Sequence, residues 1–162
     1  MMVGADPVHA DAGNVYTIEQ VATRTGLTRR TLRYYEEVGL LPPTERTEGN
    51  YRQYSEADIR RIEHIKKLRD LLGFSLNDIR EMLEADDERG QIKEAYQHAT
   101  EVEAKLAQLD RSDELTRNQL RLIEQKIKGL EQLRQPLLEK LERHEQTRQK
   151  LLTLKSSTEK DK

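Results

Sequence analysis

Hydrophobic residues recur at helical spacing along most of the chain, and short polar or glycine-containing breaks divide them into segments. The first segment begins at Thr17, whose spacing to Gln20 makes a capping box and predicts the start of a helix. Gly26 predicts a left-handed end for that helix. A second helix is predicted to begin after Thr28 and to end at Gly39, so the two helices form a helix-turn-helix.

The next stretch predicts a small hairpin followed by two more helices. Gly49 and Asn50 are turn-forming residues before the alternating YRQY, which predicts the hairpin. A third helix is expected over residues 56–72, and a fourth after the capping residue Ser75. The acidic DDE at residues 86–88 is expected to be a solvated linker rather than a cation site.

The second half of the chain repeats apolar residues every three or four positions, as a coiled coil does. Asp113 and Thr116 interrupt this seam, and a helix that continues across them is favoured over a break. Pro136 is costly inside a helix but favourable in a first turn, so a break is expected near residues 134–136. A lone helix cannot bury its apolar stripe, so a second copy is expected to pair with it through Leu106, Leu109, Leu120, Ile123, Ile127 and Leu130.

The second predicted helix carries different residues on two sides. Leu32 and Tyr35 share the arc that is expected to face the protein, while Arg30, Arg33 and Tyr34 share the outer arc. Guanidinium groups bind phosphates bidentately and reach guanine edges in the major groove. Free N–H groups at the start of the helix also suit a phosphate. This outer arc therefore predicts contact with DNA, with base reading assigned first to Arg30 and Arg33.

Composition narrows the classes of function. The chain has no cysteine, which excludes disulfides, thiolate metal sites and thiol redox sensing. The four histidines share no ligand spacing and no catalytic motif is present, so neither a metal, a cofactor nor an enzyme is expected. No apolar run reaches the length of a membrane span and no signal-peptide core is seen, so a soluble cytoplasmic protein is expected.

The net charge of -2 hides an uneven distribution. Residues 17–74 carry 11 basic and 9 acidic side chains, residues 75–114 carry 5 and 12, and residues 115–162 carry 12 and 7. Local clustering, rather than overall charge, decides whether a protein suits nucleic acid. A basic head, an acidic middle and a basic tail are compatible with DNA as a partner.

The order of these elements, and the residues within them, resembles the MerR family of bacterial transcription regulators. The resemblance rests on YTIEQVATRTGLTRRTLRYYEEVGLLPP, GNYRQYSEADIRRI and IKKLRDLLGFSLNDIREML, and it runs continuously over residues 16–84. QLRLIEQKIKGLEQLRQPL resembles the dimerisation helix of that family, whereas residues 92–115 match no known motif. The resemblance implies a winged helix-turn-helix and an antiparallel coiled coil that pairs two chains.

The same resemblance implies contacts with double-stranded DNA from the second helix, the hairpin wing and the third helix. It also implies a near-palindromic operator that lies between the two elements of a promoter. Activators of the family distort such an operator so that RNA polymerase engages both promoter elements. Core packing stays open for Tyr35, as does an ordinary surface role for Arg52 and Arg69. The full candidate DNA-binding set is Thr28, Arg29, Arg30, Arg33, Tyr34, Tyr35, Tyr51, Arg52, Tyr54 and Arg69.

Together these observations predict a mainly α protein in five stretches. They are a disordered tail over residues 1–14, a winged helix-turn-helix domain over residues 15–88, a coiled-coil dimerisation helix over residues 89–135, a C-terminal helix over residues 136–155 and a disordered tail over residues 156–162.

The leading functional hypothesis is a homodimeric, sequence-specific transcription regulator. The alternative is an architectural, chromosome-organising DNA-binding protein that joins a family-like head to a coiled-coil spacer. Family members that sense metals or oxidants use cysteines, so this chain is expected either to sense a small apolar ligand or to have no small-molecule effector. Activation and repression both remain open.

Overall fold

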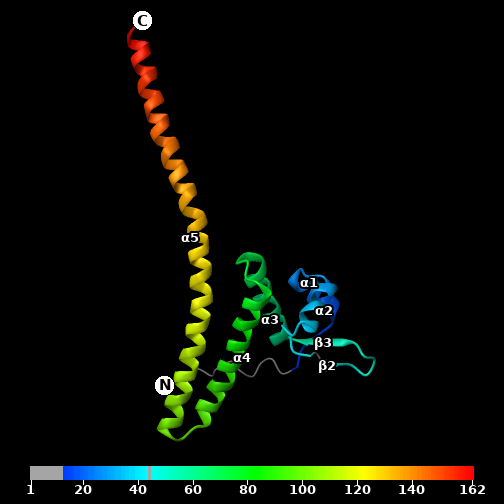
Figure 1. The fold of residues 1–162 in the computed structure, drawn as a ribbon. Coiled ribbons are helices and arrows are strands. Elements are labelled where there is room, and N and C mark those ends of the chain that lie inside the picture. Colours follow the sequence, from blue (N-terminus) through cyan, green and yellow to red (C-terminus); the bar gives the residue numbers. More distant parts are fainter. Residues whose placement is uncertain (1–12, 44) are drawn as a thin grey trace, which may run out of the picture. The chain divides into compact units, whose positions relative to one another are not determined.

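The computed structural model describes residues 13–43 and 45–162, which fold as two units. The first unit ends at Gln91, and the second runs from Ile92 to Lys162. Figure 1 shows the order of their elements, coloured from blue to red along the chain. The predicted disordered tail over residues 1–14 lies outside the described residues except for its last two positions.

A small antiparallel sheet opens the first unit. Its strands are β1 (Val15–Tyr16), β2 (Glu45–Arg46) and β3 (Arg52–Ser55), in the order β1-β3-β2. The β2–β3 pair is the predicted hairpin, which is thereby confirmed, and Asn50 turns the chain with a φ of 64°. Strand β1 was not predicted, because two residues are too few to show an alternating pattern. It adds a third strand through the pairing of Tyr16 with Tyr54.

The predicted helix-turn-helix is confirmed with its boundaries. It consists of α1 (Ile18–Thr25) and α2 (Arg29–Glu37). Both bonds of the capping box form, since Thr17 N donates to Gln20 Oε1 at 2.9 Å and Gln20 N donates to Thr17 Oγ1 at 3.3 Å. Gly26 ends α1 with a φ of 72°, a conformation that favours glycine. Thr28 caps α2 by accepting a bond from Thr31 N at 3.1 Å.

The third predicted helix changes its winding near its end. The α-helix α3 (Glu56–Lys66) continues into a π-helical turn, η1 (Lys67–Leu71), and α4 (Leu76–His98) follows. In this turn Leu72 N donates to the carbonyl of Lys67, five residues earlier, at 3.2 Å. Such single π turns often occur at functional sites. The turn carries Arg69, one of the candidate residues.

Helix α4 runs through the acidic stretch that was predicted to be a linker. Asp87 accepts a bond from Arg61 Nη1 at 2.7 Å, and Asp86 pairs with Arg89 one helical turn away. These pairings offset the like charges that would otherwise weaken the helix. The linker prediction is therefore wrong, as is a coiled-coil helix that begins at residue 89, because the chain leaves α4 only after His98.

Buried side chains at helical spacing make the core of the first unit. Helix α3 contributes Ile59, Ile62 and Ile65, and α2 contributes Leu32 and Tyr35, all at most 1% exposed. Burial of one such aliphatic side chain contributes about 1.5–3 kcal/mol. The core therefore determines which side of each short helix faces the protein.

The second unit holds one long helix after a short turn. Helix α5 (Val102–Lys160) has 59 residues, and Lys105 Nζ lies 4.9 Å from the ring centre of Tyr96 on the other side of the turn. At 1.5 Å per residue α5 is about 88 Å long. It continues through Asp113 and Thr116, as the sequence favoured. No helix in the described ranges is long and apolar enough to cross a membrane.

Helix α5 also continues through Pro136, against the prediction. The break near residues 134–136 and the separate helix over residues 136–155 are therefore wrong, and helix replaces the disordered tail up to Lys160. Proline removes one hydrogen bond, here to the carbonyl of Gln132, at a cost of about 3 kcal/mol. Long helical flanks on both sides outweigh that local cost, because helix propagates cooperatively.

Replacing the proline tests this continuity. Pro136→Ala restores the missing bond, so we expect the free energy of unfolding to rise by up to about 3 kcal/mol per chain. Urea unfolding followed by far-UV circular dichroism at one protein concentration measures the change. Gly129→Ala, where an added Cβ meets open space, is the control and should add about 1 kcal/mol. A destabilised Pro136→Ala protein would contradict a continuous helix.

Candidate nucleic-acid interface

The exposed side of α2 carries two arginines and a tyrosine that are free to bind. Leu32 and Tyr35 are buried, which leaves Arg30, Arg33 and Tyr34 facing solvent, with Tyr34 45% exposed. Within the described parts of the chain, no hydrogen bond or ion pair engages either arginine. The sorting of α2 into an inner and an outer side thus agrees with the sequence. The two guanidinium groups keep their donors for a ligand.

The first turn of α2 is held by α1. Arg29 Nη1 lies 3.0 Å from Glu19 Oε1, and both side chains are more than half exposed. Exposed pairs of this kind contribute at most about 1 kcal/mol, so a phosphate can displace the carboxylate. The hydroxyl of Thr28 is already occupied as the N-cap. Arg29 remains a candidate contact, whereas Thr28 acts by capping the helix.

An ion pair ties the hairpin wing to α2. Arg52 Nε donates to Glu36 Oε2 at 2.7 Å, and the two side chains are only 23% and 15% exposed. Tyr51, the preceding residue, is 74% exposed. A surface groove brings the wing and the helix pair together, and it is lined by Thr17, Ile18, Glu19, Arg29, Arg33, Asn50, Tyr51 and Arg52.

The second wing tyrosine lies in the core. Tyr54 is 0% exposed, so the structure contradicts the predicted contact between its side chain and DNA. Successive residues of a strand face opposite sides, and Tyr54 falls on the side that packs inward. Burial raises the pKa of its hydroxyl. Among the described residues this hydroxyl has no hydrogen-bond partner.

Tyr35 supports a candidate arginine from within the core. Its ring is 1% exposed, and its hydroxyl accepts a bond from Arg69 Nη1 at 3.0 Å. This bond raises the pKa of Arg69. The core role that the sequence left open for Tyr35 is therefore the one that the geometry favours. Arg69, whose side chain is 53% exposed, lines one shallow pocket with Tyr34, so η1 and α2 offer a continuous surface.

Comparison with known proteins identifies the family. The family model described as "MerR HTH family regulatory protein" matches residues 16–86. The HTH-type transcriptional regulator YfmP of Bacillus subtilis is 37% identical over 120 residues, which cover 74% of this chain and 86% of that protein. The chain belongs to the MerR family. It is accordingly a sequence-specific transcription regulator, related to regulators rather than to enzymes.

Other relatives match over a smaller part. The mercuric resistance operon regulatory protein of Bacillus cereus is 43% identical over 68 residues, and the match covers 42% of this chain and about half, 51%, of that protein. The solved N-terminus of MtaN, the Bacillus subtilis multidrug transporter activator, is 28% identical, with a TM-score of 0.40 over 72% of this chain and 95% of that one.

Several residues that position the interface of this MerR regulator were not found in the sequence. Glu36 holds Arg52, although nothing in the pattern links the two. Lys66 donates to the carbonyl of Thr25 at 2.6 Å and closes the end of α1. Arg24 binds Glu56 through both terminal nitrogens, and these hydrogen bonds lower the pKa of Glu56. No metal-binding cluster occurs in the described ranges.

Removal of the buried hydroxyl of Tyr54 tests whether this residue serves the core or contacts DNA. Tyr54→Phe deletes a buried polar group that lacks a partner, so we expect the free energy of unfolding to rise by about 1 kcal/mol. Operator affinity should not change. Chemical unfolding and fluorescence anisotropy with labelled DNA measure the two effects. Tyr51→Phe is the control and should leave stability unchanged; weaker DNA binding by Tyr54→Phe alone would restore Tyr54 as a contact.

Proposed function

We propose that this MerR-family regulator is a homodimer that binds a near-palindromic operator in a promoter spacer and distorts it to control transcription. The observation that carries the proposal is the outward side of α2, where Arg30, Arg33 and Tyr34 are exposed. A nine-residue helix with this side free fits the major groove. The two arginines have no competing partner within the described chain.

The contacts divide between reading and positioning. Arg30 and Arg33 have free guanidinium groups and are assigned to base edges, for which bidentate donors are suited. Tyr34, Tyr51 and Arg69 lie at the margins of the same surface and are assigned to phosphates, which fix the register of the protein on the duplex. Arg52 keeps further N–H donors beyond the one that binds Glu36, so it can serve both the wing and a phosphate.

A second copy is needed to complete the molecule. Along α5 five of the six predicted seam residues stay uncovered, with Leu106 at 55%, Leu109 at 49%, Leu120 at 49%, Ile127 at 48% and Leu130 at 56% exposure, whereas Ile123 is half-buried. Apolar side chains that recur along one side of a helix seldom stay in water when a partner can cover them. Two heads held by one coil would engage two half-sites, and their separation would strain the DNA so that RNA polymerase meets both promoter elements.

The architectural alternative is not favoured, because YfmP, whose alignment covers 74% of this chain, is a transcriptional regulator. Occupancy across the genome distinguishes the two functions. A regulator occupies few promoter spacers, whereas a chromosome-organising protein occupies many dispersed sites.

Loss of one α2 arginine should weaken specific binding. Arg33→Ala removes an exposed guanidinium without touching the core, so operator affinity should fall by about 10- to 100-fold. If the group contacts a phosphate instead of a base, the salt dependence should also become shallower by about one unit of slope. Anisotropy titrations at several salt concentrations measure both effects. Arg121→Ala on α5 is the matched control, and equal losses in both variants would contradict the assignment.

A charge in the seam should separate the two copies. Ile127→Glu places a carboxylate where the second helix must pack, so we expect a monomer at micromolar concentration and no operator binding. Light scattering coupled to size exclusion measures the mass. Gln125→Glu adds the same charge at an outward position and should remain a dimer. A dimeric Ile127→Glu protein that binds DNA normally would exclude this seam.

A further inference from the structure

The apolar seam of α5 is longer than the predicted dimer interface. Alternating steps of four and three residues lead from Val102 to Leu151 over seven heptads, and ten of the fifteen positions on them are apolar. The other five are Asp113, Thr116, Arg134, His144 and Arg148. Pro136 falls on the outer side of this repeat, one residue before the seam position Leu137. Because the helix continues past the proline, the repeat keeps its frame into the C-terminal third.

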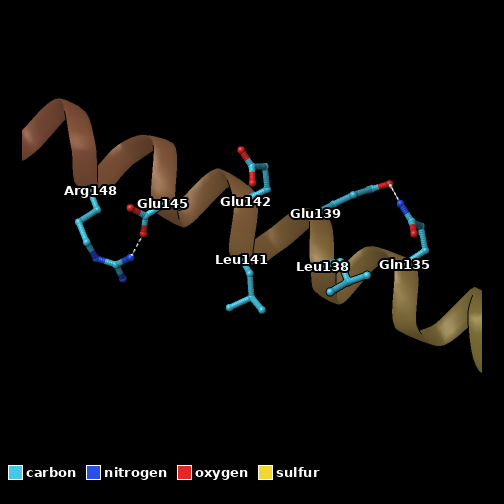
Figure 2. Close-up of a pocket in the computed structure, with 7 residues that line it drawn as sticks. All are labelled: Gln135, Leu138, Glu139, Leu141, Glu142, Glu145 and Arg148. Carbon is cyan, nitrogen blue, oxygen red and sulfur yellow. Dashed lines mark hydrogen bonds and ion pairs between the residues drawn. The ribbon is translucent and has the colours of Figure 1, made fainter.

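The leucines in that third are uncovered. Leu137, Leu141 and Leu151 are 63%, 65% and 60% exposed. Figure 2 shows Leu138 and Leu141 projecting from one side of α5. These leucines therefore lack a cover within their own unit.

The two ends of α5 carry opposite charge. Residues 101–114 have five acidic and two basic side chains, and residues 148–162 have five basic and two acidic ones. The helix dipole accounts for such a bias only in the first and last turns, yet Asp110 and Lys150 lie beyond them. Two parallel helices would bring like charges together, whereas two antiparallel helices would bring the acidic start of one against the basic end of the other.

We propose that the C-terminal third of α5 is a docking surface for the start of α5 in a second copy of this chain. The proposal rests on the homodimer described above and extends its interface at both ends. It gives one role to two segments that are otherwise unexplained, namely residues 102–115 and residues 137–155. Each segment covers the other across the antiparallel pair.

One register forms three apolar pairs and one polar pair along the seam. When Leu151 packs on the partner's Leu106, Leu137 packs on the partner's Leu120, and Leu130 packs on the partner's Ile127. The same register places His144 opposite the partner's Asp113, whereas Thr116 faces the partner's Leu141. In each of these pairs, one of the two seam positions of the heptad packs on the other seam position of the partner, as it does in antiparallel coiled coils. Arg134 and Arg148 face apolar residues, which their aliphatic stems can cover while the charged ends reach water.

Disulfide trapping tests the register directly, since the chain has no cysteine. In the full chain, the double variant Leu106→Cys with Leu151→Cys should form a covalent dimer under mild oxidation, because a bridge requires Cα atoms within about 7 Å. The two positions in one helix are about 68 Å apart and cannot react with each other. Leu106→Cys with His144→Cys, one heptad away, should stay monomeric on a denaturing gel. No bridge in the first variant, or a bridge in the second, overturns the proposal.

A second measurement uses exposed positions that leave the fold intact. Leu151→Glu should weaken dimerisation at least tenfold in sedimentation equilibrium, whereas Thr153→Glu, on the outer side, should leave it unchanged. Equal dimerisation by both variants overturns the docking surface. If the unmodified chain is a dimer that binds operator DNA but these tests fail, only the extended interface is wrong. A monomeric unmodified chain would instead refute the proposed homodimer.

Discussion

Burial of Leu32 and Tyr35 beneath α2 determines what this protein can present to DNA. A helix turns 100° per residue, so two inward side chains set the direction of all the others. Arg30, Arg33 and Tyr34 face outward for that reason. A nine-residue helix is marginal by itself, and the core beneath it supplies most of its stability.

The end of α2 is held as firmly as its inner side. Arg61 Nε donates to the carbonyl of Leu40 at 2.7 Å, and Arg80 Nη2 donates to the carbonyl of Val38 at 2.8 Å. These arginines come from α3 and α4, so both later helices bond to the chain just after α2. The wing and the π turn reach the same helix, through the bond from Arg52 to Glu36 and the bond from Arg69 to Tyr35. The interface is therefore ordered before any ligand arrives, which lowers the entropy cost of binding.

The features that the sequence predicted correctly are those that depend on residues close together in the chain. Caps at Thr17 and Thr28 and the glycine at Gly26 determine helix ends through neighbouring residues, and all three were found. The features that the sequence did not predict depend on contacts between residues far apart in the chain. The alternation in YRQY predicts that Tyr51 and Tyr54 face opposite sides, but not which side is the core. Likewise, the acidic residues of α4 are stabilised partly by Arg61, a partner on another helix that no local pattern reveals.

Pro136 shows where a local rule gives the wrong result for a physical reason. A strict seven-residue repeat over seven heptads does not fit a straight helix with 3.6 residues per turn, so a paired helix must curve around its partner. Such curvature is convex toward solvent, where carbonyl groups tilt outward to water. Pro136 lies on the side away from the seam, and there water can satisfy the carbonyl of Gln132 that loses its N–H partner. In the proposed pair, a proline in that position would bend α5 in the direction that coiling requires, so the residue that predicted the end of the helix is instead compatible with its continuation.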